Sequence, residues 1–313
     1  MTVKEEEFDM NTVFTKAMSF LIFIALGYLC RKKKWLPKET AAILVKINLN
    51  ICLPCLVIIN FSGSGVDLSL IFLVFLGLLE AIITVLAGAL LSRKMPQKTR
   101  ITYMVGTSAY NIGTFATPFL SSFLSPASVV AACVFDTGNA IASTGVTAAL
   151  SSLILKLDGE KPDPLKLVRK LLSNITIITY ITMFILGLIG ISVPAAIQEI
   201  LRPAANANMF IAMFMLGLMF HIEFRREYLN RLFQMLGMRF ALSVLFALGS
   251  WFLLPFPLEV RQALTLLPFA PITSLAPAFT QMNGGDEGLA SCANSLSIAF
   301  SIICLTLLVG FIA

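Results

Sequence analysis

The sequence is poor in charged residues and nearly lacks histidine. Only 13% of its 313 residues are Asp, Glu, Lys or Arg, against about 25% in an average soluble domain. The single histidine, His221, excludes a site built from several imidazoles, and we expect it to lie at a membrane interface. The chain also lacks a nucleophile paired with a base, a phosphate-binding loop and a nucleotide fingerprint. We therefore expect neither an enzyme nor an ATP-driven pump.

The cysteines lack the spacing of a metal site or of a disulfide framework. All of them fall in or at the end of apolar segments, at Cys30, Cys52, Cys55, Cys133, Cys292 and Cys304. Cys52 and Cys55 have the spacing of a redox pair, but thiols that pack as small hydrophobic side chains are the simpler interpretation. We expect no metal and no other bound cofactor.

Long apolar stretches fill most of the chain. Hydrophobic residues make up 58% of it, and the mean hydropathy is +0.88. A transmembrane helix needs about 20 apolar residues, so the sequence predicts an all-α integral membrane protein with short loops. We expect ten spans, near residues 11–30, 40–61, 68–91, 101–124, 127–155, 168–191, 204–222, 232–254, 258–282 and 288–312.

The net charge of +6 does not indicate a nucleic-acid partner, because the basic residues cluster in every second loop. These loops follow spans one, three, five and seven, whereas the alternate loops hold almost no Lys or Arg. Cytoplasmic loops of membrane proteins are enriched in these two residues. We therefore expect a multi-pass protein of the cell membrane, surrounded by lipid, with both termini outside the cytoplasm.

The fourth predicted span is interrupted at Asn111–Pro118, which reads Asn-Ile-Gly-Thr-Phe-Ala-Thr-Pro. An unpaired backbone group in lipid costs several kcal/mol, so such a break survives only where protein or water covers it. The ninth span is interrupted in the same way at Pro268–Pro277. Paired interruptions indicate the binding site of a transporter, although a pair of proline kinks is a structural alternative.

A shift of 159 positions relates the two halves of the chain. It aligns Thr114 with Thr273, Pro118 with Pro277, Ala131 with Ala290, Cys133 with Cys292 and Ala140 with Ala299. Each half has five spans, an odd number, so the second half must enter the membrane inverted. We expect an outer tail at residues 1–10, a first repeat at 11–157, a cytoplasmic linker at 158–167 and a second repeat at 168–313.

The two breaks supply the residues that we expect to contact a substrate. A helix that restarts inside the membrane points its free amide groups at the membrane centre, which favours an anion. The substrate-binding candidates are Asn111, Gly113, Thr114, Thr273, Ser274 and Asn294, and the helix-breaking prolines are Pro118, Pro271 and Pro277.

Ionisable residues within the predicted spans are candidates for ion coupling. A carboxylate inside a membrane is costly and usually functional, and Asp136 lies well inside span five, with Asn139 on the same helix face. They offer oxygens for Na⁺, a proton site or hydrogen bonds to substrate. A structural bond to the freed backbone of span four is the alternative. Glu80 is a further candidate; the repeat aligns it with Arg239, and the two either form a structural ion pair or contact substrate.

Short motifs in a fixed order resemble the auxin efflux carrier family, which shares its architecture with the bile acid and sodium symporters. They are Ile24-Ala-Leu-Gly-Tyr28 before a basic loop, Leu53-Pro-Cys-Leu56, Asn111 seven residues before Pro118, and Ala276-Pro277-Ala278 before Gly285-Asp-Glu-Gly-Leu-Ala-Ser291. The resemblance covers essentially the whole chain. Without a long hydrophilic central loop, the chain resembles the compact bacterial members.

The resemblance implies two inverted five-helix repeats in which the broken helices 4 and 9 cross at the site. Spans 1, 2, 6 and 7 would form a scaffold, often a homodimer, and spans 3–5 and 8–10 a moving transport unit. It implies elevator-type secondary transport of small organic anions, such as malonate, malate or auxin-like acids. Ala116-Thr117-Pro118 departs from the common Gly-Ile-Pro, so a plant-like substrate does not follow. A Na⁺-coupled symporter of larger amphipathic anions and a membrane sensor that binds without transport are alternatives.

Overall fold

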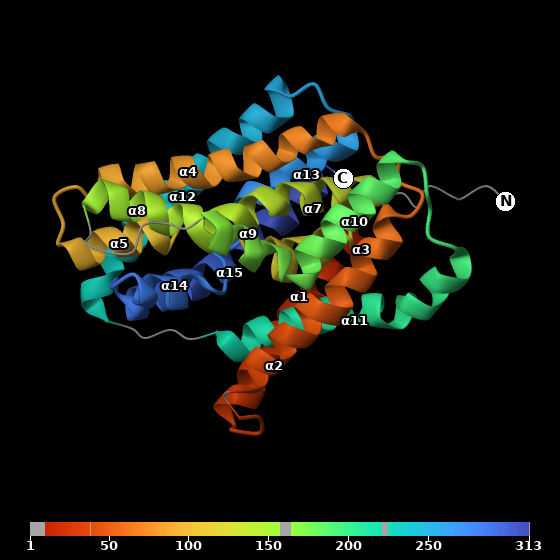
Figure 1. The fold of residues 1–313 in the computed structure, drawn as a ribbon. Helices are drawn as coiled ribbons and strands as arrows, with labels where there is room; N and C mark the ends of the chain where they lie inside the picture. The colour runs from red at the N-terminus through yellow and green to blue at the C-terminus, as the bar shows by residue number, and fades with distance from the viewer. Residues whose placement is uncertain (1–9, 38, 157–163, 221–224, 313) are drawn as a thin grey trace.

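A computed structural model describes residues 10–37, 39–156, 164–220 and 225–312 (Figure 1). His221, the predicted tail up to residue 9 and most of the predicted linker lie outside these residues. Every regular element in the described part of the chain is a helix, and seven of the helical spans are long and apolar enough to cross a membrane. The prediction of an all-α membrane protein is confirmed.

The first half of the chain contains eight α-helices among its described residues. They are α1 (Met10–Lys32), α2 (Thr40–Ile47), α3 (Leu53–Phe61), α4 (Phe72–Leu91), α5 (Gln97–Val105), α6 (Thr117–Leu120), α7 (Pro126–Ile141) and α8 (Thr147–Leu155). A 3₁₀ turn, η2 (Leu68–Ile71), precedes α4, and three π-helical segments lie between other helices: η1 (Asn48–Cys52), η3 (Ile112–Ala116) and η4 (Ala142–Val146). Such π-helical turns occur frequently at functional sites.

The second half contains no π-helical segment in its described part. Its elements are α9 (Pro164–Leu172), α10 (Ile175–Leu188), α11 (Ala195–Met219), α12 (Arg226–Leu253), α13 (Leu258–Leu266), the 3₁₀ turn η5 (Leu267–Phe269), α14 (Ala276–Met282) and α15 (Glu287–Ile312). The predicted spans four and nine are each divided into two short helices, α5 with α6 and α13 with α14.

Three predicted span starts are wrong, at spans six, seven and eight; the last, α12, begins at Arg226 instead of residue 232. Span six was expected to begin at residue 168, but α10 begins at Ile175, because the Asn174 side chain accepts the Thr176 amide at 3.0 Å and starts a new helix. The residues before it form the separate short helix α9. Span seven was expected from residue 204, but α11 begins at Ala195 and runs through Pro203. Proline is tolerated inside membrane helices.

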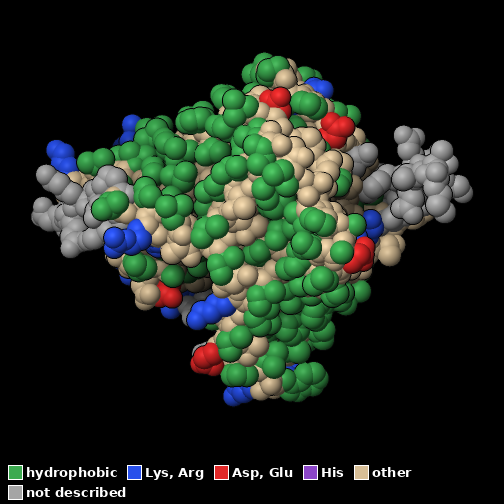
Figure 2. Space-filling model, turned by 45° about the vertical axis from the view of Figure 1, so that its right-hand side comes forward, with side chains coloured by type: hydrophobic (Ala, Val, Ile, Leu, Met, Phe, Trp, Pro, Cys, Tyr) green, Lys and Arg blue, Asp and Glu red, His purple; other side chains and the backbone are tan. Residues whose placement is uncertain are grey.

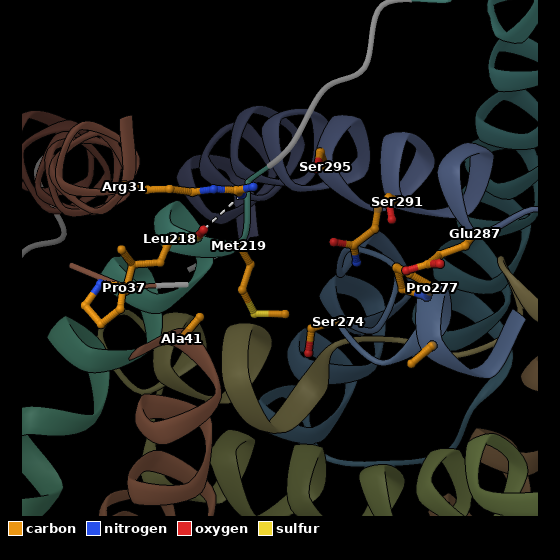
Figure 3. Close-up of a pocket in the computed structure, with 12 residues that line it drawn as sticks. Arg31, Pro37, Ala41, Leu218, Met219, Ser274, Pro277, Glu287, Ser291 and Ser295 are labelled. Carbon is orange, nitrogen blue, oxygen red and sulfur yellow. Dashed lines mark hydrogen bonds between the residues drawn. The ribbon is translucent and has the colours of Figure 1, made fainter. Parts of the chain in front are cut away.

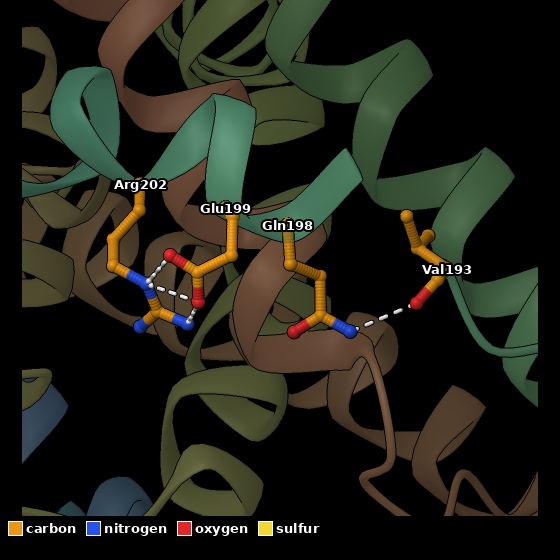
Figure 4. A network of polar contacts seen from close by, with 4 residues as sticks. All are labelled: Val193, Gln198, Glu199 and Arg202. Atoms are coloured by element: carbon orange, nitrogen blue, oxygen red, sulfur yellow. Dashed lines mark hydrogen bonds and ion pairs between the residues drawn. The ribbon is translucent and has the colours of Figure 1, made fainter. Parts of the chain in front are cut away.

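Polar side chains mark the N-terminal end of α11 (Figure 4). Arg202 binds Glu199 through two nitrogens, the shorter contact being 2.8 Å, and both side chains are exposed. The Gln198 amide donates to the Val193 carbonyl at 2.8 Å, just before the helix begins. These residues lie on α11, although the predicted span seven began only at residue 204.

Glycines allow two pairs of helices to pack closely. Gly27 in α1 faces Gly217 in α11, and Gly77 in α4 faces Gly138 in α7. A Cβ atom at any of these positions would collide with a backbone carbonyl of the facing helix. Small residues at helix contacts are typical of membrane proteins, since they let two backbones approach.

The surface is rich in exposed apolar side chains. Figure 2 shows hydrophobic residues over much of one face, with Lys, Arg, Asp and Glu mostly near its periphery. Large exposed side chains include Ile200, Phe233, Phe252 and Leu253, all more than 70% exposed. A face of this kind is suited to lipid rather than water.

Candidate functional site

The two breaks predicted from the sequence lie side by side at the centre of the fold. Tyr110 and Ile272 form an antiparallel β-bridge. The Asn111 amide donates to the Pro271 carbonyl at 2.8 Å, and the Thr273 amide donates to the Ala109 carbonyl at 3.1 Å. Each break therefore supplies hydrogen-bond partners for backbone groups that the other leaves outside a helix, as burial away from water requires.

An asparagine in the long helix after each break hydrogen-bonds with the backbone of that break. The Asn139 side chain in α7 accepts the Tyr110 amide at 2.9 Å and donates to the Tyr110 carbonyl at 3.0 Å. In α15, the Asn294 amide donates to the carbonyls of Ile272 at 2.7 Å and Thr273 at 3.0 Å. Asn139 and Asn294, which were both predicted as site residues, therefore stabilise the non-helical backbone of the breaks.

Arg239 in α12 hydrogen-bonds with backbone carbonyls next to both breaks. Its buried guanidinium donates to the carbonyl of Thr107, and to those of Ala270 at 3.2 Å and Pro271 at 3.4 Å. It also lies over the ring of Tyr110, 4.4 Å from the centroid. Arg239 therefore acts on the backbone of both breaks at once.

Glu80 in α4 lies on the opposite side of Tyr110 from the backbone contacts of Arg239. The Tyr110 hydroxyl hydrogen-bonds with the Glu80 carboxylate, whose Oε2 atom is buried without a partner. Within the described residues, Glu80 and Arg239 form no direct ion pair. The two opposite charges are thus separated by the tyrosine and remain close enough to compensate each other.

Asp136 in α7 joins this region to α10. One carboxylate oxygen accepts the Asn139 amide at 2.9 Å, and the other accepts the hydroxyl of Tyr180 at 3.2 Å. Asp136 and Tyr180 are both buried, and no Lys or Arg in the described ranges pairs with the carboxylate. The Tyr180 contact was missed from the sequence; a phenol inside an apolar span needs a partner and was the available signal.

The side-chain amide nitrogen of Asn111 has no hydrogen-bond partner among the described residues. The side-chain oxygen accepts the hydroxyl of Thr114, while the nitrogen is buried. Gly113 packs beside Leu53 and Asp136, so a Cβ atom there would lie 3.1 Å from Leu53 Cδ2 and 3.5 Å from Asp136 Oδ2. The first break therefore packs directly against α3 and α7 and keeps one unused donor.

A cavity of about 310 Å³, here called the first cavity, adjoins the second break (Figure 3). Arg31, Leu218 and Met219 lie on one side of it, and the second break and α15 form the other (Figure 3). Among the predicted residues it contains Ser274, Asn294 and Pro277. The remaining lining residues are Pro37, Ala41, Ala278, Glu287, Ser291 and Ser295.

The first cavity brings together only part of the predicted set. Asn111, Gly113 and Thr114 do not line it, and Thr273 lines a separate cavity. Arg31 was interpreted only as part of a basic loop, yet its guanidinium donates at 3.1 Å to the carbonyls of Leu218 and Phe220, at the edge of the cavity. No sequence pattern identified it, because α1, α11 and α15 are distant in sequence.

Comparison with protein families agrees with this geometry. The family model described as membrane transport protein matches residues 12–309. No curated protein matches the chain.

Proposed function

Because the chain belongs to the membrane transport protein family, which is the auxin efflux carrier family, it is a membrane transporter, and we propose that it carries small organic anions by alternating access. The predicted resemblance to this family is confirmed. The observation that carries the proposal is the first cavity, which reaches the second break between helices from distant parts of the chain.

The proposed architecture is ten spans in two inverted repeats. Seven long apolar helices, the shorter Ile175–Leu188 and the two interrupted segments together number ten. The reciprocal bonds between residues 109–111 and 271–273 support an inverted relation, since each break occupies the same position relative to the other. This is the plan of many secondary transporters.

The proposed movement is that of an elevator. α1, α2, α3, α10 and α11 form the scaffold, and the remaining spans form the transport unit. The two groups meet where α1 contacts α15, α3 contacts α7 and η1 contacts η3. The bond from Tyr180 to Asp136 crosses this boundary, so sliding of the transport unit must break it or carry it to a new partner. A homodimer through the scaffold remains a prediction.

An anion suits the polar groups of the first cavity. Arg31 contributes a cation that stays charged at any physiological pH, and Ser274 and Ser291 contribute hydroxyl donors. Glu287 lies on the same wall as Ser291 and disfavours a second negative charge near it (Figure 3). We therefore place the carboxylate of a substrate nearer Arg31 and Ser274.

Uptake of labelled malonate, malate and indole-acetate into proteoliposomes tests the transport proposal. We expect one of these anions to accumulate under an imposed H⁺ or Na⁺ gradient, and Ala278→Leu, which narrows the first cavity, to reduce the rate. Binding without uptake would instead indicate a sensor. The absence of both binding and uptake for every anion would overturn the assignment.

We propose Asp136 as the residue that couples transport to H⁺ or Na⁺. It is a buried carboxylate at the boundary between the two groups of helices, with hydrogen-bond donors on both oxygens. Asp136→Asn is expected to abolish the dependence of uptake on the driving gradient, since an amide neither ionises nor binds a cation strongly. Tyr180→Phe should change the rate but keep the dependence. Full gradient dependence in the Asp136→Asn protein would remove Asp136 from the coupling role.

A further inference from the structure

A second cavity, of about 230 Å³, lies against the other face of α14. Pro277 and Ala278 line the first cavity, whereas Phe279, Met282 and Asn283 line the second. Pro277 and Phe279 point in nearly opposite directions from a helix with 3.6 residues per turn, whereas Ala278 and Met282 are one turn apart, where the two cavities adjoin. At the break itself, the adjacent residues Thr273 and Ser274 belong to the second and first cavity, respectively.

The described residues that line the second cavity carry charge of one sign. Lys170 of α9 is the one charged side chain among them. The Lys170 ammonium lies 5.5 Å from the centroid of the Phe279 ring, and no carboxylate in the described ranges pairs with it. By contrast, the first cavity contains Glu287 as well as Arg31. The second cavity is therefore the more favourable of the two for an anion.

The inner end of the second cavity carries hydroxyl groups. Ser108 and Thr147 are buried, with 1% and 4% of their surfaces exposed, whereas Lys170 is exposed. The Thr147 hydroxyl has no partner among the described residues. A buried hydroxyl without a partner is unfavourable, and a ligand that accepts its hydrogen bond removes this cost. The π-helical segment η4 ends just before Thr147 and adds Thr144 to the same wall.

Phe279 and Met282 contribute the large apolar side chains of the wall, and Ser143, Thr273 and Asn283 add further polar groups. We propose that the second cavity binds a small organic carboxylate, with its carboxylate between Lys170 and Thr147 and its apolar body against Phe279 and Met282. The class of anion rests on the proposed function; the site itself rests on the cavity, the cation and the unpartnered hydroxyl. The bound anion lies next to the first cavity, because the adjacent residues Thr273 and Ser274 line the two cavities. The second cavity therefore serves as a holding site from which the anion enters the first.

Equilibrium binding of labelled phenylacetate to the purified full chain in lipid nanodiscs tests this site. Ala278→Leu is introduced first, so that the first cavity contributes little. In this background, we expect Lys170→Gln to lower the affinity about tenfold and Thr147→Val to lower it severalfold. Arg169→Gln, the neighbouring cation outside the cavity, is the matched control and should leave the affinity unchanged.

Three outcomes would overturn the second site. An equal loss with Arg169→Gln would show a general effect of positive charge, and unchanged binding in Ala148→Leu, which fills the cavity, would place the ligand elsewhere. Displacement of phenylacetate by added phosphatidylglycerol, but not by malonate, would identify a lipid headgroup as the occupant. Uptake by the chain without Ala278→Leu separates the proposals: normal uptake together with binding that does not depend on Lys170 overturns the second site alone, and Lys170-dependent binding without uptake overturns transport alone.

Discussion

The two breaks differ in accessibility although the sequence makes them equivalent. In the first break, Asn111, Thr114 and Thr117 are buried, and only Gly113 is partly exposed. In the second, Ser274 is partly exposed and Leu275 is 47% exposed. One break is thus sealed by packing, while the other opens into cavities on both faces of α14.

The length of chain in each break explains the difference. The reciprocal hydrogen bonds pair Asn111 with Thr273 as equivalent positions, a shift of 273 − 111 = 162. The helices that follow begin at Thr117 and Ala276, a shift of 276 − 117 = 159. Between the paired residue and the α-helix that follows it, the first break has five residues, 112–116, and the second has two, 274–275. The five residues form the π-helical segment η3, in which Ile112, Thr114, Phe115 and Ala116 are buried.

The largest effect that we predict is the loss of the contact shared by both breaks. Arg239→Leu leaves the buried carbonyls of Thr107 and Ala270 without this donor and Glu80 without a nearby cation, while the Pro271 carbonyl keeps the Asn111 amide. Removing one partner of a buried charge pair costs about 3–5 kcal/mol, and we expect a loss of this size in the free energy of unfolding in detergent. Arg202→Leu, which removes an exposed pair, should cost no more than about 1 kcal/mol. Similar values for the two variants would contradict the role given to Arg239.

A smaller and unequal effect is expected from the two asparagines. Leaving a buried polar group without its partner costs about 1–3 kcal/mol. Asn139→Ala should fall at the upper end, because Asn139 serves both backbone groups of Tyr110 and also donates to Asp136. Asn294→Ala should cost less, since Ser297 still accepts the Ile272 amide. Thermal unfolding measures the loss of stability in each variant. Asn60→Ala, which removes a hydrogen bond within a single helix, is the control. A larger loss for Asn294→Ala than for Asn139→Ala would contradict the comparison.

The accessibility of the breaks is measured by thiol labelling. In a chain whose native cysteines are replaced, Ser274→Cys is expected to react with a hydrophilic maleimide at least about tenfold faster than Thr114→Cys, because only the former lines a cavity and thiol reactivity requires access. Equal rates would show that both breaks reach water. Addition of a transported anion should slow labelling at position 274 selectively.

The smallest effect is expected at Gly113. Its added Cβ atom meets the end of the Leu53 side chain at 3.1 Å, and that side chain can shift. Gly113→Ala should therefore change the free energy of unfolding by less than about 1 kcal/mol, since the reduced freedom of the unfolded chain offsets part of the clash. Gly138→Ala, whose Cβ atom meets the backbone of α4, provides the contrast and should destabilise strongly. An equally large loss at Gly113 would indicate that the first break has no room to adjust.

The sequence was sufficient for the class of protein and for the second break, whereas the first break is displaced: residues 106–111 lie outside a helix, and most of Asn111–Pro118 belongs to η3 and α6. Apolar runs, basic loops and paired interruptions reflect the cost of placing charge or unpaired backbone in lipid, and this cost acts locally on each segment. The same reasoning failed at the starts of α10 and α11. There a side-chain cap at Asn174 and a proline tolerated within a helix decided the boundary, and neither effect is visible in average hydropathy.

The sequence by itself determined that this chain enters a membrane, that two of its segments cannot be continuous helices, and that Asp136 and Asn139 share a helix face. Only the tertiary structure decided that Arg239 binds both breaks, that Tyr180 meets Asp136, and that Thr273 and Ser274 line cavities whereas Asn111, Gly113 and Thr114 line neither of the two. Hydropathy and helical period depend on neighbours in the chain, whereas these contacts depend on how residues far apart in sequence fill the same space.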